Sequence, residues 1–576
     1  MKKINVHFLI FLLIAVSVSI SDIVIYFLNS NFIITNSIVL LFNIVFLGVL
    51  KKKGYIDIKS NFSKFDFIFI LGLLLYMIFS IPFPDLSWDT RSYHIYIQEN
   101  VFIDKLNFDF FAGRNLNSFL FALGDRINYL FRYVLGYRFG TIISYYLILV
   151  LFYQVKRFLK EITNSENELF LSIFSIFPCV LSIILAFAGT YYIDNFGLVC
   201  LMEIFYILLF EKNLFDEKIK IYILGILIGI SISIKVTNII FIIPIVLYFL
   251  IKNFKELRKL KFYDYILVMF CLIFPFGIYA LDNFIQTGNP VFPYYNNIFK
   301  SEYFMLSEWK DTNFGPVNLI QFLIWPIYIV FYPARAFDTK FVDLIWGLGF
   351  IVDIFYIIYC IFKKKCTQNK LFILSMIIFF TYYLWEKLLI GYVRYATIIL
   401  VLSFIVIISL IYTQFKNKKW ISILGIFIIC FAILPSIGYD LLVKVKDYGS
   451  VFQIIEEYKS NIKYIFKDRN NEKVDSSQIL GAIGDDSLIP TLLRNGNNIY
   501  NLEEWVTATS EVTKNMYSEK ILNKEIYIYC DGKTLDRKKS YLENNSFEVV
   551  EEREENREFS FLSPSNKMYV LKVRKK

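Results

Sequence analysis

The chain has 576 residues, of which 57% are hydrophobic and 19% are charged, and its mean hydropathy is +0.53. Soluble domains carry about 25% charged residues, so this composition excludes a disordered or collagen-like chain and argues against a soluble enzyme. The seven cysteines show no CxxC spacing, which excludes a disulfide framework and a structural zinc site.

The formal net charge of +10 is carried by short loops between apolar runs, whereas residues 438–576 are roughly neutral. The basic clusters lie at 51–53, 156–157, 252–261, 363–365 and 416–419. Short loops rich in Lys and Arg mark the cytoplasmic side of membrane proteins. We therefore expect no binding to nucleic acid, which needs a basic stripe with stacking aromatic residues.

About 13 apolar runs are predicted to form the helices of a membrane domain, and most of them have membrane-spanning length. They lie at about 6–28, 32–50, 65–83, 134–153, 169–188, 193–210, 221–234, 236–251, 263–281, 341–362, 371–390, 394–413 and 421–437. The first run is too long for a signal peptide, and no small-residue cleavage site follows it, so we expect it to be retained. A cytoplasmic N-terminus places all the basic loops on one side and the C-terminus outside.

One further segment, 317–333, is apolar and almost long enough to span the membrane. A span there would move the basic loops 363–365 and 416–419 to the outer side, against the charge rule. We therefore predict an interfacial or re-entrant helix on the outer face.

The predicted organisation is a polytopic α-helical domain, 1–437, with long outer loops at 84–133 and 282–340. It is followed by a small extracytoplasmic α/β domain, 438–576. Alternating apolar residues predict strands at 525–530 and 567–573, and a helical pattern lies at 511–522.

The first outer loop carries the first candidate site residues. Asp89 stands at the start of an expected interfacial helix, followed by Arg91, Tyr93 and His94. The carboxylate of Asp89 has two readings, a helix cap favoured by the helix dipole or a catalytic group. Asp85 is the alternative acid in the same loop.

A second aspartate, Asp194, stands in a very short outer loop. It is either a solvated surface acid or a second carboxylate that faces the cavity of Asp89. Asp89, His94 and Asp194 are also the candidate ligands for a possible divalent metal, a weak signal because only one histidine is available.

Lys235 is the most informative cation. The chain between Lys220 and Lys252 must cross and return, so each helical limb has about 15 residues, or roughly 22 Å. The hydrocarbon core is about 30 Å thick. We therefore expect Lys235 at the floor of an outward-facing cavity, where it either snorkels or binds an anion such as phosphate.

Two arginines and a tyrosine complete the candidates. Arg394 begins an apolar helix at the outer interface, and Arg335 ends the interfacial segment. Each is either a headgroup anchor or a second phosphate ligand. Tyr294 lies in a turn rich in proline and aromatic residues, 287–296, which suits a sugar or a lipid headgroup.

Five segments, in this order, resemble the GT-C superfamily of polyprenyl-phosphate-sugar-dependent glycosyltransferases, with a likeness to the aminoarabinose transferase and protein O-mannosyltransferase branch. They are Trp88-Asp-Thr-Arg-Ser-Tyr-His94, Thr190-Tyr-Tyr-Ile-Asp194, Ser233-Ile-Lys235-Val-Thr237, Thr287-Gly-Asn-Pro-Val-Phe-Pro293 and Arg394-Tyr395. The resemblance covers roughly 60–410. The chain departs from the family in having two spans before the loop of Asp89, where the family commonly has one.

The resemblance implies a GT-C-like fold and an inverting sugar transfer from a polyprenyl-phosphate donor to a hydroxyl on a lipid, glycan or protein acceptor. Asp89 would be the general base, and Asp194 would orient the acceptor or a metal. Lys235, with Arg394 or Arg335, would hold the donor phosphate. Arg91, Tyr93, His94 and Tyr294 would contact acceptor or sugar.

Three other functions remain open from the sequence. A transporter or lipid flippase commonly has internal repeats and a polar path across the membrane, and neither is evident here. A polysaccharide polymerase or ligase of another fold would also have large outer loops. A structural anchor for the outer domain leaves Lys235 unexplained.

Overall fold

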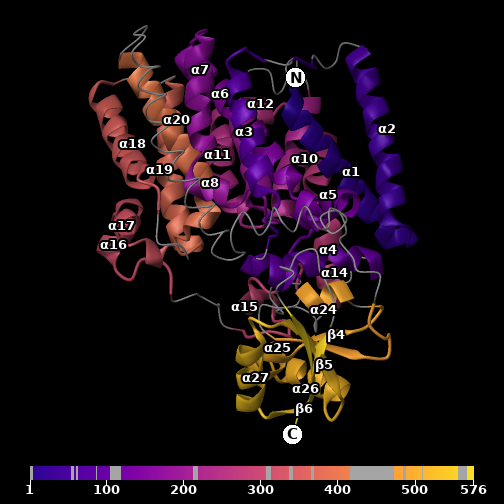
Figure 1. The fold of residues 1–576 in the computed structure, drawn as a ribbon. Coiled ribbons are helices and arrows are strands. Elements are labelled where there is room, and N and C mark those ends of the chain that lie inside the picture. Colours follow the sequence, from indigo (N-terminus) through magenta and orange to yellow (C-terminus); the bar gives the residue numbers. More distant parts are fainter. Residues whose placement is uncertain are drawn as a thin grey trace.

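The computed structural model describes residues 4–52, 58–59, 62–85, 87–103, 119–211, 218–306, 313–336, 342–364, 369–414, 473–483, 488–493, 495–508, 510–555 and 567–575. A helical bundle forms one part of the molecule, and a small domain with a β-sheet extends from one end of it (Figure 1). The predicted span 421–437 and the predicted domain boundary at 438 lie outside the described residues.

Long apolar runs form the helices of the bundle because a helix satisfies its own backbone hydrogen bonds where water is absent. They are α1 (Val6–Leu28), α2 (Phe32–Lys52), α3 (Asp66–Ser80), α4 (Ile95–Ile103), α5 (Leu123–Phe139), α6 (Ile142–Thr163), α7 (Glu168–Cys179), α8 (Ser182–Ala186), α9 (Asp194–Phe210), α10 (Ile219–Ile234), α11 (Asn238–Lys252), α12 (Phe254–Leu257), α13 (Phe262–Ile273), α14 (Gly277–Thr287), α15 (Asn296–Phe299), α16 (Leu319–Leu323), α17 (Trp325–Phe331), α18 (Ile345–Phe362), α19 (Lys370–Leu388) and α20 (Thr397–Gln414). Short turns η1 (Thr90–His94), η2 (Pro333–Arg335) and η3 (Val393–Ala396), and the strand pair β1 (Ile4–Asn5) and β2 (Ile58–Lys59), complete this part.

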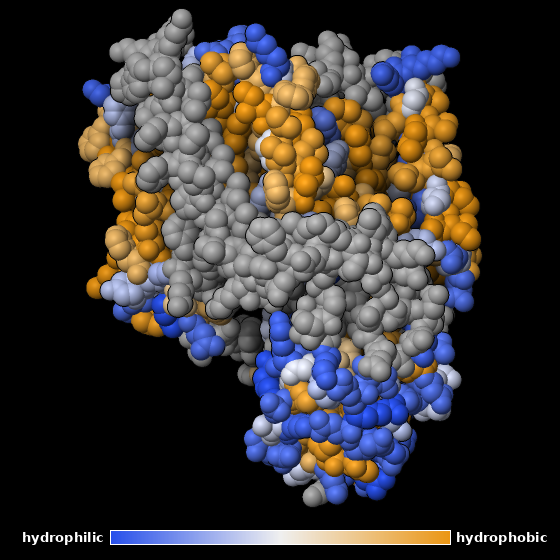
Figure 2. Space-filling model, viewed as in Figure 1, coloured by the Kyte–Doolittle hydropathy of each residue, from blue (hydrophilic) through white to orange (hydrophobic). Residues whose placement is uncertain are grey.

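Within the described residues, six helices are long and apolar enough to cross a membrane, and a bent pair of helices would be a seventh. Four shorter apolar helices accompany them. Large apolar side chains such as Phe42 on α2, Phe270 on α13 and Phe355 on α18 are more than 60% exposed, and orange surface covers the sides of the bundle in Figure 2. These features are those of a multi-pass membrane protein; the predicted count of 13 spans stays a prediction.

Two predicted spans have different boundaries in the structure. The run predicted at 134–153 is divided between α5 and α6, and within the last turns of α5 the positive φ of 80° at Gly136 interrupts the helical geometry. The helix α6 then continues to Thr163, so the pair 156–157 does not lie in a loop as predicted.

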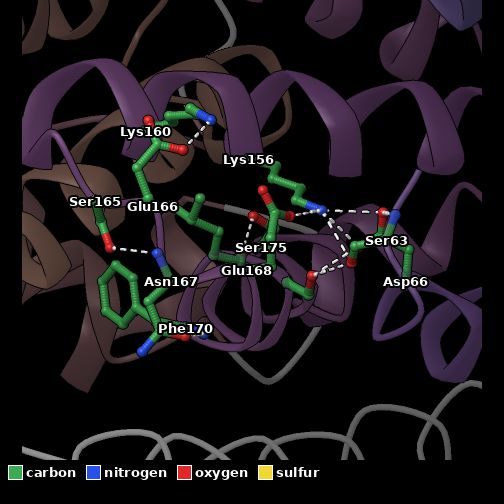
Figure 3. A network of polar contacts seen from close by, with 12 residues as sticks. Ser63, Asp66, Lys156, Lys160, Ser165, Glu166, Asn167, Glu168, Phe170 and Ser175 are labelled. Atoms are coloured by element: carbon green, nitrogen blue, oxygen red, sulfur yellow. Dashed lines mark hydrogen bonds and ion pairs between the residues drawn. The ribbon is translucent and has the colours of Figure 1, made fainter. Parts of the chain in front are cut away.

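Ion pairs explain why α6 continues through that basic pair. The Lys156 ammonium donates to both carboxylate oxygens of Asp66 at 2.8 and 3.0 Å and pairs with Glu168 at 2.8 Å (Figure 3). Arg157 pairs with Glu203 at 2.7 Å. These contacts join α3, α6, α7 and α9 at the end of the bundle opposite the small domain (Figure 1).

Three other predicted helices are broken. The run 169–188 forms α7 and α8, with Pro178 near the break, and the run 263–281 forms α13 and α14, which meet at a bend of 70°. The segment 317–333 forms the short helices α16 and α17, with Pro326 at the second position of α17. Proline removes a backbone donor and clashes with the preceding turn, which explains such breaks.

The small domain contains a five-stranded mixed sheet with the order β4-β3-β5-β7-β6. Its elements are β3 (Ile479–Ala482), α24 (Leu488–Leu493), β4 (Ile499–Asn501), α25 (Leu502–Thr507), α26 (Glu511–Ile521), β5 (Ile526–Asp531), α27 (Leu535–Asn544), β6 (Phe547–Glu555) and β7 (Met568–Lys575). Strand β3 is parallel to β4 and β5, whereas β7 is antiparallel to β5 and β6. The alternating apolar residues predicted two of these five strands, β5 and β7, since successive side chains of a strand face opposite sides.

Candidate functional site

Four charged side chains from distant parts of the sequence form one hydrogen-bonded chain. The Arg394 guanidinium donates to the Asp89 carboxylate through Nη1 and to Asp194 Oδ2 through Nε at 3.1 Å. The Lys235 ammonium donates to the other Asp194 oxygen at 2.5 Å. Two carboxylates and two cations therefore alternate along one row, and Arg394 joins the two acids.

Helix ends bring these residues together. Asp89 comes directly before the turn η1, and Asp194 is the first residue of α9. Lys235 directly follows α10, in the short connection to α11. Arg394 lies in η3, which leads into α20. The helices α10 and α11 are short, with 16 and 15 residues. The connection between them therefore turns back early, and it is this connection that carries Lys235 into the cluster.

The cluster is mostly buried but remains accessible through its cations. The side chain of Asp194 is 2% exposed and that of Asp89 is 9% exposed, whereas Lys235 and Arg394 keep 14% and 13%. Buried charges are tolerated when each has an opposite charge and hydrogen bonds. The site can therefore hold its cations ready for an anion while the two carboxylates balance their charge.

Aromatic rings surround the two cations. The Lys235 ammonium lies 4.3 Å from the centre of the Tyr395 ring, and the Arg394 guanidinium lies 4.2 Å from the centre of the Tyr192 ring. Tyr93 is buried beside them and interacts electrostatically with Asp89 and Arg394. Such faces stabilise a cation and offer a flat surface to a sugar.

The two aspartates of the first outer loop have different hydrogen-bond partners in the structure. Asp85 accepts hydrogen bonds from the backbone N–H of Ser87 at 2.9 Å, the Thr90 hydroxyl at 2.6 Å and the backbone N–H of Tyr191 at 2.7 Å, so its carboxylate fastens this loop to the next one. Asp89 makes no side-chain capping bond at the start of η1. The reading of Asp89 as a helix cap is therefore wrong, and its carboxylate is directed to Arg394.

His94 forms a buried pair behind the cluster. Its Nδ1 lies 2.8 Å from Asp125 Oδ1 on α5, and both side chains are at most 2% exposed. Burial by itself would lower the pKa of the His94 imidazole, but the carboxylates of Asp125 and Asp89 raise it above its ordinary value of 6.5. Asp125 was not among the predicted site residues, because it lies in the segment predicted as the first outer loop. The available signal was an acid next to Arg126 and seven positions before Arg132 in an amphipathic run.

The candidate metal ligands do not fit a metal site. Asp89 and Asp194 are both held by Arg394, Asp194 also binds Lys235, and the Nδ1 of His94 is used by Asp125. Among the described residues, no group of three or more His, Cys, Asp or Glu side chains converges. Since a divalent cation would stand next to two positive side chains, we derive no step through a metal.

The other predicted residues lie around the cluster. Arg335 donates to the backbone carbonyls of Asn313 at 2.9 Å and Gly315 at 2.7 Å; its role as a ligand of the donor phosphate stays a prediction. Its neighbour Ala336 accepts from the backbone N–H of Val393 at 2.9 Å, which ties η2 to η3.

Tyr294 and Arg91 are two of the residues predicted to contact acceptor or sugar. Tyr294 is 45% exposed, and it interacts electrostatically with Tyr395. Arg91 pairs with Asp531 of the small domain at 3.5 Å. Tyr294 thus interacts with the tyrosine that follows Arg394, whereas Arg91 contacts the small domain.

Comparisons with known proteins give structural likenesses only. No family model and no curated protein matches the chain. The structure is similar to ArnT from Cupriavidus metallidurans bound to undecaprenyl phosphate, at 12% identity over 88% of this chain and 97% of that chain, with a TM-score of 0.49. It is also similar to the apo oligosaccharyltransferase of Archaeoglobus fulgidus, at 14% identity over 83% of this chain and 71% of that one, with a TM-score of 0.41.

A third similar structure is the oligosaccharyltransferase AglB from Archaeoglobus fulgidus in complex with an inhibitory peptide and a dolichol-phosphate. Its identity is 11% over 82% of this chain and 70% of that chain, with a TM-score of 0.38. We base the functional proposal on the residues of the site.

Proposed function

We propose that the chain is an integral-membrane glycosyltransferase of the GT-C type, which transfers a sugar from a polyprenyl-phosphate donor to a hydroxyl group of a lipid, glycan or protein acceptor. The observation that carries this proposal is the row Asp89–Arg394–Asp194–Lys235. It places a carboxylate beside two cations, as a transfer from a phosphate leaving group requires.

In the proposed reaction, Asp89 accepts the proton of the acceptor hydroxyl while that oxygen attacks the anomeric carbon. The bond from the anomeric carbon to the phosphate oxygen breaks, and its electron pair leaves with the lipid phosphate. A single displacement of this kind inverts the anomeric centre. Lys235 and Arg394 stabilise the negative charge that develops on the leaving phosphate.

The ion pairs of the free protein suggest how the donor prepares the site. An Asp89 oxygen is occupied by Arg394, and Asp194 is occupied by Lys235 and Arg394. A phosphate that binds Lys235 and Arg394 would compete with both carboxylates for these donors. The Asp89 carboxylate would then be released toward the acceptor hydroxyl, so that the base becomes available when the donor is bound.

The proposal includes an orientation in the membrane. Arg91, two residues after Asp89, contacts Asp531 of the small domain, whereas α7, whose residue Glu168 pairs with Lys156, lies toward the opposite end of the bundle (Figure 1). We propose that the cluster and the small domain face the extracytoplasmic side of the cytoplasmic membrane and that the N-terminus is cytoplasmic. Alkaline phosphatase fused after Lys576 should be active, whereas the same enzyme inserted at 164–166 should be inactive; the reverse pattern would overturn this orientation.

Purified protein in detergent or nanodiscs tests the activity directly. It would be incubated with radiolabelled polyprenyl-phosphate sugars and a panel of lipid, glycan and protein acceptors, with products identified by mass. We expect transfer from at least one donor with inversion at the anomeric carbon. Product with retained configuration would contradict the single displacement, and absence of transfer from every donor together with ATP- or gradient-dependent lipid movement would favour a flippase.

A further inference from the structure

The small C-terminal domain shares a hydrophobic core with the loops that carry the candidate site. Ile95 and Tyr96 of α4, Tyr137 of α5 and Tyr191 beside Asp194 pack in one buried cluster with apolar residues of the domain. The domain members of this cluster are Val474, Leu480, Ala482, Leu488, Ile489, Leu492, Leu493, Ile499, Tyr529, Met568 and Val570. The domain is therefore fixed to the segment that follows Asp89.

A charged contact reinforces this docking within the same turn as Asp89. Asp531 is the last residue of β5, and its carboxylate pairs with Arg91 of η1 at 3.5 Å. The Asp531 side chain is only 4% exposed, and its other oxygen accepts the backbone N–H of Thr534 at 2.9 Å. The carboxylate is thus held in place by its own domain and directed to the loop.

The turn that Arg91 belongs to has an unusual backbone. The N–H of Ile95 donates to the carbonyl of Thr90, five residues earlier, so η1 is a π-helical turn. Such turns are rare and need surrounding contacts to persist, and they are frequent at functional sites. Asp89 precedes this turn directly, so the direction of its carboxylate depends on the turn being kept.

The domain also holds the second outer segment. The Ser510 hydroxyl donates to the carbonyl of Glu302 at 2.5 Å, and the Thr513 hydroxyl donates to the carbonyl of Tyr303 at 3.1 Å. This segment follows the turn that carries Tyr294. One domain therefore contacts both segments that border the four-charge cluster.

We propose that the C-terminal domain positions Asp89, and that Asp531 is a positioning residue which acts through Arg91 and η1. This inference rests on the proposed glycosyltransferase function. A general base must lie within hydrogen-bond reach of its proton, and a displacement of about 1 Å costs roughly 10²-fold in rate. The donor cations Lys235 and Arg394 lie on other elements, so the loss of Asp531 changes turnover and leaves donor binding unchanged.

Substitution of Asp531 in the full-length protein tests this role. We expect Asp531→Asn, which keeps the size of the side chain, to lower kcat by about 10–100-fold without changing the KM for the polyprenyl-phosphate sugar. Asp531→Glu, which keeps the charge, should retain most of the turnover. The control is Glu525→Gln, which removes exposed ion pairs to Lys572 and Arg574 on the same sheet and should leave both constants unchanged.

Hydrogen exchange separates this inference from the proposed function. The amides of 88–99 should exchange faster in Asp531→Asn than in wild type, and this readout needs no activity. Wild-type kcat in Asp531→Asn, or a change confined to the donor KM, would overturn the positioning role. If wild-type protein transfers no sugar, the proposed function fails, and unchanged exchange of 88–99 in Asp531→Asn would overturn the docking role separately.

Discussion

Arg394 and Asp89 lie 305 positions apart in the chain, yet the Arg394 guanidinium donates directly to the Asp89 carboxylate. The same guanidinium donates to Asp194, so one arginine sets the distance between the two acids. An arginine can do this because its donors form a planar fork, which a lysine cannot replace.

Replacing the proposed base should abolish transfer. Asp89→Asn keeps the shape of the side chain but removes its capacity to accept the acceptor proton, so we expect kcat to fall by roughly 10²–10⁴-fold. Radiolabelled sugar transfer by the purified variant measures this. The matched control is Glu302→Gln, an exposed acid on the second outer segment, which should keep wild-type turnover. Normal turnover in Asp89→Asn would remove this residue from the mechanism.

Replacing the proposed phosphate ligand should weaken use of the donor. Lys235→Met removes a charge-assisted hydrogen bond worth about 1.5–3 kcal/mol, so we expect the donor KM to rise by roughly 10–100-fold. Initial rates over a series of donor concentrations measure the change, with Lys300→Met as the control because Lys300 is an exposed lysine on the same side. An unchanged donor KM would mean that Lys235 serves only to balance Asp194.

The stability of the protein should depend on pH through His94. Burial alone would lower its pKa in the folded protein, but the carboxylates of Asp125 and Asp89 together raise it above 6.5. The folded state therefore binds the proton more tightly, so this contribution to stability is complete below pH 6.5 and is lost as the pH rises through the folded pKa.

Thermal unfolding in detergent between pH 5.5 and 9 measures this dependence. The unfolding temperature of wild type should fall as the pH rises, and the fall should be smaller in His94→Gln, which has no titrating ring. Equal slopes in both proteins would show that another group controls the dependence.

The buried ion pair between Lys156 and Asp66 should contribute more to the free energy of unfolding than the exposed pair between Lys160 and Glu166. Lys156→Met leaves the fully buried Asp66 carboxylate without its ammonium partner, and breaking a buried pair costs about 3–5 kcal/mol. Lys160→Met removes an exposed pair with Glu166, which is worth about 0–1 kcal/mol. Both pairs are drawn in Figure 3. Thermal unfolding of the two variants compares them, and similar losses of stability would contradict the difference.

The sequence could name the charged residues but could not rank them. Arg335 and Arg394 had equal standing as ligands of the donor phosphate, because both follow or precede apolar helices at the expected outer interface. Packing of η2 against η3 directs Arg335 to backbone carbonyls and Arg394 to the two carboxylates. The sequence favoured Asp89 over Asp85 but could not predict the contacts of Asp85, since the hydrogen bond from the Tyr191 backbone N–H to Asp85 depends on contact between two separate loops.

Helix boundaries were predicted well where the apolar run alone determines them, as for α1, α10 and α11. They were predicted poorly where a glycine, a proline or a buried ion pair changes the local preference. The chain through Gly136 breaks although its neighbours are apolar, and α6 continues through Lys156 because Asp66 and Glu168 neutralise that charge.

Apolar run lengths and strand alternation are properties of consecutive residues, so they were sufficient to predict a helical membrane protein with a small α/β domain. The hydrogen bonds between the charges, and the docking of the C-terminal domain on the turn after Asp89, follow from the folded arrangement alone. Those contacts join residues hundreds of positions apart, and their energies depend on distances that no local pattern specifies.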